Sequence, residues 1–588
     1  MRILVNEWLV QWFQGFENVY CSARQIVPRR GLIVPHEICV KKVTANMMIT
    51  YYEFHKYNLL VKPQFTNNIG TTMQQSLYDY IQQHIDEDGV FTERTLPDGS
   101  DLTNIVEPGQ TDAFYYTADM PSNDEDASTV LKDLRAYLAE PNINSYQKLY
   151  KDLKDMSMAE YADPFIAAFD SDDMNETAFA LARRLLYNAR HREPLKFALL
   201  LFGLYGMHHI EENDPELWRD LVTTAHCEEF TFAFLYSCRV TNHISQHAVW
   251  ELLGCTKGWG KVFAIIDCQC PDADHRHWLL KNGPDIDVEY PPLAVKLIQA
   301  TQLDKFLQQP VIDYPCYKSA IAILGNYMML LLHYKPEAVR ENYNLTDINL
   351  YGMLKNLLHH ALYLSVEAED MLDMITIATS LRSMQEENSL YSLTPNQVQE
   401  LIAACDKMVY NTNWEPIINS RLFENDQVNY QLADLAYELE LDIWQQLYDF
   451  WLVHPMEYTL LPYLLSYEGG TRSQRVLAKL TANLPLYANE LHSLVVPLHY
   501  LRNHPGQGET ILCFALCSIF ELLRSCACDV LEAWGADYLS ESIKEAIYSA
   551  LHSSTDDLVQ ARLLAILQGK KLDVEAFLQR LKQKQKKK

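Results

Sequence analysis

From about Ala127 to Leu567 the sequence alternates between helical segments and short polar breaks. In "MNETAFALARRLLYNARHREPLKFALLLFGLYG" the apolar residues of the first segment recur at the spacing of one helix face, at Ala178, Leu181, Ala182, Leu185 and Leu186. Pro194 then opens a second segment that is apolar on nearly all sides. A one-sided helix followed by an almost fully buried helix is typical of stacked helical hairpins.

The same alternation returns further along, for example in "DPELWRDLVTTAHCEEFTFAFLYSC" and in "YPCYKSAIAILGNYMMLLLHYKP". At roughly 40 to 47 residues per two-helix unit, the region could hold on the order of ten units. No period is strict. We therefore expect a mainly α protein built as an irregular HEAT-like α-solenoid, and a non-repeating helical bundle is the alternative.

The regions outside this array differ in composition. Residues 1–85 are rich in β-branched and aromatic residues and predict a small N-terminal α+β module. Residues 86–126 are dense in carboxylates and predict an acidic loop or linker. Residues 127–567 form the helical-hairpin region, and 568–588 predict a terminal helix with a basic tail. Such a tail could contact RNA, a membrane or the protein's own carboxylates, or it could simply be solvated.

Composition and charge restrict the compartment and the partners. Hydrophobic residues make up 48% of the 588, which indicates a folded protein, and the net charge of -28 disfavours nucleic acid as a partner. The 13 cysteines lack the spacing of a disulfide framework, and the apolar runs are shorter than the roughly 20 residues that span a bilayer. We expect a cytoplasmic protein without a membrane span.

One stretch, "GWGKVFAIIDCQCPDADHRHWLLKNG", gathers four potential metal ligands, Cys268, Cys270, His275 and His277. Residues two apart on a helix point about 200° apart, so His275 and His277 should face opposite ways. We predict a helical hairpin whose second helix starts at Asp272 and ends at "NG", with His275, Trp278 and Leu279 on its packed face and Cys268 as an apolar filler. A zinc site is the alternative, but C-x-C-x4-H-x-H is not a standard zinc spacing.

The same stretch resembles a hairpin of an uncharacterised bacterial HEAT-repeat-like family. The matching residues are Gly258, Trp259, Gly260, Asp272, Trp278, Leu279, Leu280 and Gly283. Two later segments, "LDIWQQLYDFWLVHP" and "LRNHPGQGETILCFALCSIFELLRSCACDVLEAW", are similar to later helices of that family. The resemblance covers about Gly258 to Leu567, with gaps, and implies a helical-repeat fold. Some members are labelled limonene hydroxylase, whereas this sequence has no Gly-x-Gly-x-x-Gly for a flavin and no haem-thiolate motif.

Two further histidine clusters are candidate sites. "GMHHIEEND" places His208 and His209 beside Glu211 and Glu212, which predicts a polar inter-helix loop, with a metal or acid-base site as the alternative. His359 and His360 lie on one predicted helix and point about 100° apart, so at most one could join a site.

From these patterns we assign no catalytic residue, no cofactor-binding residue and no metal ligand, and we expect no cofactor. The function we expect is a non-enzymatic scaffold or adaptor that binds a protein or peptide partner on an acidic solenoid surface. The alternative is a metal-dependent hydrolase or oxygenase, including the limonene hydroxylase label, using His208, Glu211, His275 or His277. The partner's identity and the oligomeric state stay open.

Overall fold

The structure is a computed structural model, and it describes residues 75–93, 95–98, 107–117, 122–170, 173–333, 348–364, 366–387, 390–466, 470–490, 492–574 and 577. The predicted N-terminal module lies outside the described residues except for its last part, and the end of the basic tail lies outside them as well. The described residues are mainly helical, as predicted, and their only strands form the two-residue hairpin of β1 (Phe423–Glu424) and β2 (Gln427–Val428).

The chain divides into two compact units. The first, here called the 68–413 unit, spans Asn68–Asn413. Its helices are α3 (Leu77–Gln83), α4 (Gln110–Thr117), α5 (Asp124–Ala139), α6 (Ile143–Lys154), α7 (Met158–Ala168), α8 (Glu176–Asn188), α9 (Arg192–Tyr205), α10 (Met207–Asn213), α11 (Pro215–Ala225), α12 (Glu228–Val240), α13 (Gln246–Cys255), α14 (Trp259–Asp267), α15 (Ala273–Asn282), α16 (Leu293–Thr301), α17 (Leu303–Phe306), α18 (Tyr314–His333), α20 (Leu350–Ala361), α21 (Asp370–Glu386) and α22 (Pro395–Tyr410).

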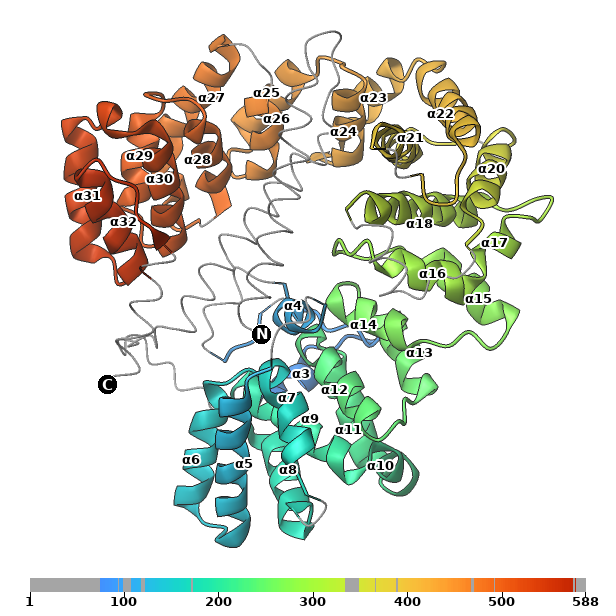
Figure 1. The fold of residues 1–588 in the computed structure, drawn as a ribbon, viewed down its shortest axis with the longest axis vertical. Helices are drawn as coiled ribbons and strands as arrows, with labels where there is room; N and C mark the ends of the chain where they lie inside the picture. The colour runs from blue at the N-terminus through green and yellow to red at the C-terminus, as the bar shows by residue number, and fades with distance from the viewer. Residues whose placement is uncertain are drawn as a thin grey trace. The chain divides into compact units, whose positions relative to one another are not determined.

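Most helices of the 68–413 unit pack in two rows (Figure 1). In one row α9 contacts α12, α12 contacts α14, α14 contacts α16, α16 contacts α18 and α18 contacts α21. Each of these helices also packs against a partner in the second row, in the order α8, α11, α13, α15, α20 and α22. Neighbours in space are thus close in sequence throughout this part of the unit.

The first pair of this arrangement follows the predicted pattern. The buried residues of α8 are the five of the predicted stripe, Ala178 to Leu186. Helix α9 is buried from Pro194 to Gly203, as expected of a helix with neighbours on several sides. A Cβ on Gly203 would lie 2.7 Å from the carbonyl oxygen of Ser237, so the absence of a side chain lets α9 and α12 approach closely.

Part of the segment expected to be an acidic loop is helical. Helix α4 lies within residues 86–126, and its Asp112 and Ala113 are buried. Gly109, at φ +76°, precedes the helix, and its N–H donates to Glu229 Oε2 at 3.1 Å. This helix was not predicted, because composition does not distinguish a carboxylate that is buried beside cations from one that is solvated.

The second unit is described from Trp414 onward. It contains α23 (Glu415–Arg421), the β1–β2 hairpin, α24 (Tyr430–Glu438), α25 (Trp444–Val453), η3 (Tyr458–Leu460), α26 (Leu461–Ser466), α27 (Gly470–Asn483), η4 (Leu484–Tyr487), η5 (His492–Leu494), α28 (Val495–Arg502), α29 (Glu509–Leu516), α30 (Glu521–Trp534), η6 (Ala536–Tyr538), α31 (Glu541–Ser553) and α32 (Asp557–Leu567). Its later helices again contact near neighbours in sequence: α28 packs on α30, α30 on α32, and α29 on α31. Across the described residues of both units, no helix is long and apolar enough to cross a membrane.

Candidate functional site

The stretch with four potential ligands forms the α14–α15 hairpin. Helix α14 begins where the Glu228 carboxylate accepts the N–H groups of Lys257, Gly258 and Gly260 at 2.8 to 3.0 Å. Helix α15 begins at Asp272, whose side chain accepts the N–H of His275 at 2.9 Å. The predicted hairpin, with its start at Asp272 and its end at Asn282 and Gly283, is confirmed.

The four residues do not converge on one point. Cys268 is 1% exposed and lies just after α14, packed as predicted. His275 Nδ1 donates to Asp272 Oδ1 at 2.7 Å and the ring faces Trp250, while His277 contacts Cys316 on α18. The predicted divergence of the two histidines is confirmed. The predicted packed face holds only in part for His275. Its ring contacts Trp250 of α13, but its side chain is 39% exposed because this helix turn lies at the rim of a pocket.

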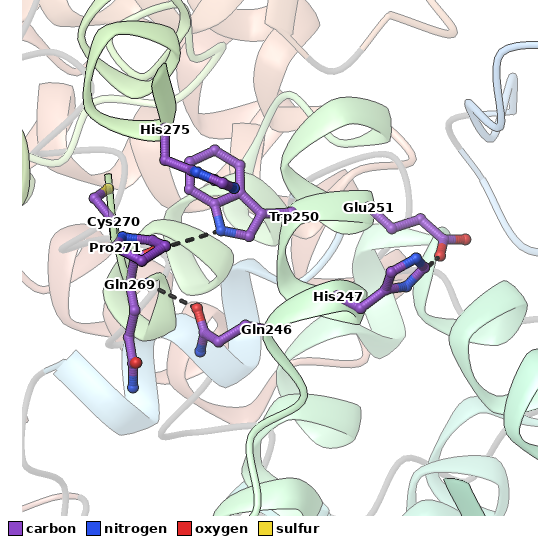
Figure 2. A pocket seen from close by; sticks show the side chains of 8 residues that line it. All are labelled: Gln246, His247, Trp250, Glu251, Gln269, Cys270, Pro271 and His275. Atoms are coloured by element: carbon purple, nitrogen blue, oxygen red, sulfur yellow. Dashed lines mark hydrogen bonds and ion pairs between the residues drawn. The ribbon is translucent and has the colours of Figure 1, made fainter. Parts of the chain in front are cut away.

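That pocket has a volume of about 880 Å³ and lies between α13, the α14–α15 connection and the first turn of α15. Figure 2 shows the Trp250 ring between the loop that carries Cys270 and the side that carries Glu251. The lining residues are Gln246, His247, Trp250, Glu251, Gln269, Cys270, Pro271 and His275. Trp250 is half-buried and makes edge-on contacts with the rings of His275 at 4.7 Å and Trp278 at 5.4 Å.

Hydrogen bonds hold the pocket in shape. Trp250 Nε1 donates to the carbonyl of Gln269 at 3.2 Å, and the N–H of Gln269 donates to Gln246 Oε1 at 2.7 Å. Glu251 accepts from His226 Nε2 at 3.0 Å, and this bond lowers the pKa of Glu251. The pocket wall therefore carries a carboxylate that stays ionised, beside an aromatic ring.

The cysteines of the stretch interact with each other. The Cys268 thiol donates a hydrogen bond to Cys270, which raises the pKa of Cys268 and lowers the pKa of Cys270. Cys270 is half-buried at the pocket wall, whereas Cys268 is enclosed. The pair thus presents one thiol to the pocket and keeps the other in the core.

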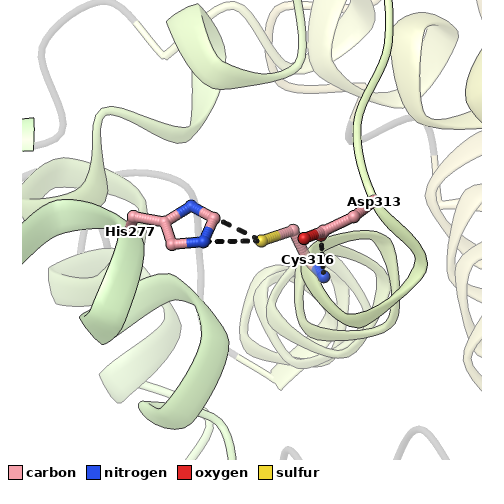
Figure 3. A group of neighbouring side chains, drawn as sticks. All are labelled: His277, Asp313 and Cys316. Carbon is pink, nitrogen blue, oxygen red and sulfur yellow. Dashed lines mark hydrogen bonds between the residues drawn. The ribbon is translucent and has the colours of Figure 1, made fainter. Parts of the chain in front are cut away.

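On the opposite face of α15, His277 meets Asp313 and Cys316 (Figure 3). One potential ligand atom from each residue lies within 4.8 Å of the other two. Asp313 Oδ1 accepts the N–H of Cys316 at 2.9 Å, and hydrogen bonding to Cys316 lowers the pKa of Asp313. Burial, followed by the neighbouring Asp313, raises the pKa of the Cys316 thiol to about 12. Within the described part of the chain, these three residues form a group whose ligand atoms lie close enough together to hold one metal ion.

His277 is a candidate ligand in the sequence, whereas Asp313 and Cys316 were not predicted. The signal for them is the Asp-x-x-Cys spacing at the start of α18, which places a carboxylate and a thiol on the same side of a first helical turn. The link to His277 could not be read from the sequence, because it depends on how α15 packs against α18.

The cluster at 208–212 is helical rather than a loop, since α10 covers it. His208 and His209 are exposed, and Glu211 turns away to His243 and Ser245, which it contacts at 2.7 Å each. The Glu211 carboxylate thus holds the α12–α13 connection in place. His208 reaches it only through His243, whose ring centroid lies 5.7 Å from that of His208.

His360 is buried, and its Nε2 lies 3.0 Å from the carbonyl oxygen of Leu307. His359 is exposed on the same helix, with its ring 5.1 Å from that of Tyr363. The prediction that at most one of them could join a site agrees with this divergence.

A buried ionic cluster, not predicted from the sequence, connects α4, α9 and α12. Lys196 is 1% exposed, and its Nζ lies 2.9 Å from Asp112, 3.2 Å from Glu193 and 2.8 Å from Glu229. Arg192 adds contacts to Asp98 at 2.7 Å and to Glu229 at 3.2 Å. The lone lysine within the apolar run "PLKFALLLFGLY" was the available signal.

Burial and the cations shift these carboxylates in opposite directions. Burial raises the pKa of Asp112 to about 7 despite its ion pair with Lys196. Glu229 is also desolvated, but Lys196 and Arg192 together outweigh that and lower its pKa to about 2. Four carboxylates thus share two cations, which leaves the cluster with excess negative charge. Asp112 binds a proton more readily than Glu229 does.

Comparison with known proteins identifies no relative of this chain. No protein-family model, no curated protein and no solved structure matches this chain.

Proposed function

We propose that this protein is a non-enzymatic interaction scaffold, a HEAT-like α-solenoid whose acidic surface binds a basic segment of a protein or peptide partner. The proposal is supported by the two rows of helices in the 68–413 unit, in which each helix contacts its near neighbours in sequence. Arrays of this kind expose long surfaces to which extended partners bind. We also place its action in the cytoplasm, because the described cysteines are free thiols.

The observation that carries the proposal is the pocket beside Trp250. Its volume of about 880 Å³ lies within the usual range for sites that bind a small molecule or an anchoring side chain. A half-buried tryptophan that is already held by a hydrogen bond to Gln269 loses little side-chain freedom on binding.

The charge of the pocket favours a cationic partner. Glu251 is ionised, and the eight lining residues include no lysine or arginine. A lysine or arginine side chain could place its charge over the Trp250 ring and near Glu251. The net charge of -28 would steer a basic segment toward the protein and repel nucleic acid.

A displayed library of short peptides, selected on the full-length protein, tests this proposal. The selected peptides should be rich in lysine or arginine, and their affinity can be measured by fluorescence anisotropy. Trp250→Ala should lower that affinity at least about fivefold, because an aromatic anchor in an interface contributes more than about 1 kcal/mol. Glu251→Gln, which keeps the shape of the side chain, should also weaken binding and reduce its dependence on salt.

Tyr548→Ala is the matched control, because Tyr548 is an exposed aromatic residue of the other unit. It should leave the affinity unchanged. Selection of acidic peptides, selection of none, or peptides that bind Trp250→Ala as tightly as the unaltered protein would contradict the proposal.

A further inference from the structure

The contact between α15 and α18 contains a set of side chains that no part of the proposed scaffold function uses. His277 lies on α15, Asp313 directly precedes α18, and Cys316 lies in the first turn of α18. Figure 3 shows His277 and Cys316 pointing toward each other across the gap between the two helices. An imidazole, a carboxylate and a thiol are three of the side-chain groups that proteins use to hold transition metals.

The distances between Cys316 and His277 are compatible with two ligands of one metal ion. Cys316 Sγ lies 3.8 Å from His277 Nδ1 and 4.0 Å from Nε2. With zinc bond lengths of about 2.3 Å to sulfur and 2.0 Å to nitrogen, two tetrahedral ligands lie about 3.5 Å apart. Sγ lies nearly equally far from the two nitrogens, so the imidazole ring must turn about its side-chain bonds to aim one nitrogen at a shared metal ion.

The local structure holds the carboxylate and the thiol in place before any ion arrives. Asp313 Oδ1 accepts the N–H of Cys316, which fixes the carboxylate beside the thiol. One turn further along α18, Ser319 Oγ donates to the carbonyl of Lys281 at 3.1 Å and ties the two helices together. A site on helices that are already tied needs little rearrangement to bind.

The burial of the three residues leaves one coordination position open. Cys316 is fully buried, whereas His277 and Asp313 are exposed. A metal ion held by the three would therefore keep a face toward solvent, where a water molecule could complete a tetrahedron. The exposed Lys281 lies one turn from His277 and opposes a cation, but its charge is screened by water.

The ligand set selects the metal. Magnesium and calcium prefer oxygen ligands only, whereas a thiol combined with an imidazole suits zinc and its neighbours. We propose that His277, Asp313 and Cys316 form a binding site for one zinc-class divalent ion, with water as the fourth ligand.

Loading of the metal-free, full-length protein with Co²⁺ and then Zn²⁺ tests this site. Wild-type protein should bind one Co²⁺ with the charge-transfer absorption of a cobalt–thiolate bond, and Zn²⁺ should displace it and raise the melting temperature. Cys316→Ser should abolish the charge-transfer band, and His277→Gln should weaken zinc binding at least about 100-fold, because loss of a direct ligand exceeds the effect of an outer partner.

The matched controls are His275→Gln and Cys270→Ser, which alter the same hairpin on its other face. Both should keep the one bound ion, the absorption band and the stabilisation by Zn²⁺. Circular dichroism checks that every variant is folded. Absence of stoichiometric Co²⁺ or Zn²⁺ on the wild type, or a charge-transfer band that persists in Cys316→Ser and disappears in Cys270→Ser, would overturn the proposal.

Discussion

Lys196 and Asp112 form an ion pair in the interior of the 68–413 unit, with Nζ 2.9 Å from Oδ2, although they are 84 positions apart in the sequence. Lys196 is 1% exposed and Asp112 is fully enclosed. The pair connects α9 to a helix that lies in the carboxylate-rich segment. A charge at this depth is tolerated only when partners surround it.

Replacement of Lys196 by methionine, which has a similar length, should destabilise the protein by about 3–5 kcal/mol, because it leaves carboxylates buried without their main cation. Urea denaturation followed by circular dichroism measures the change. Lys544→Met, at an exposed i,i+3 pair, should change the stability by less than about 0.5 kcal/mol. Adding Asp112→Asn to Lys196→Met should restore part of the loss, and a double variant no more stable than the single one would contradict this account.

The raised pKa of Asp112 predicts a specific dependence of stability on pH. Asp112 binds its proton more tightly in the folded protein, where its pKa is about 7, than at its ordinary value of 3.8 in the unfolded chain. Its contribution to the unfolding free energy therefore falls as the pH rises from about 4 to about 7. The asparagine of Asp112→Asn does not titrate. The unfolding free energy of the wild type, relative to that of the variant, should therefore fall across that window by at most about 1.4 kcal/mol per pH unit.

The groups that face Asp112 are Lys196, Glu193 and Glu229. Glu229 has a lowered pKa, so its contribution is lost only as the pH falls from about 4.5 toward 2. Denaturation curves of both proteins between pH 4.5 and 8 measure the Asp112 effect. A stability difference that stays constant, or that grows with pH, would show that Asp112 is ionised throughout.

Substitution by alanine should have opposite effects on stability at two helical glycines, one at the close approach of α9 and α12 and one in α13. Gly203→Ala should destabilise the protein by about 1–3 kcal/mol, because its Cβ would meet backbone and side-chain atoms of Ser237 at 2.7 to 2.9 Å. Gly254→Ala, in α13, meets nothing within 4 Å and should stabilise the protein by about 0.5–1 kcal/mol. The melting temperatures of the two variants and the wild type measure these effects. A Gly203→Ala variant as stable as the wild type would mean that α9 and α12 lie further apart than the structure shows.

In metal-free protein, His275→Leu and His277→Ala should each shift the melting temperature by less than about 2 °C, because both side chains lie at the surface. His277→Ala should shift it less than His275→Leu, which removes the contact with Asp272 and part of the packing against Trp250. Differential scanning calorimetry in the presence of a chelator measures both. A large loss of stability in the metal-free His277→Ala variant would mean that His277 packs as a core residue.

The helices were predictable where a periodic apolar stripe ended at a recognisable cap. The stripe of α8 and the Asp272 cap of α15 are both in the structure at the predicted residues. Local sequence determines such features, because both the cap and the stripe involve residues within a few turns of each other.

The sites were not predictable in the same way. Cys316 reads as a small apolar residue of α18, and only the packing of α15 brings His277 to it. Asp112 reads as one acid among many in its segment, and only Lys196 and Glu229 make it a buried one. Each depends on a contact between elements that are far apart in the sequence, which a single sequence does not encode locally.

The distance along the chain between the charges of the buried cluster also sets an order of assembly during synthesis. The rows of helices can form progressively, because each helix meets partners that have just been made. Asp112 emerges from the ribosome long before Lys196, and Glu229, the acceptor of the Gly109 N–H, lies 120 positions after Gly109. The carboxylate of α4 must therefore stay hydrated while α5 to α9 are translated, and it loses its water only when α9 and α12 are in place.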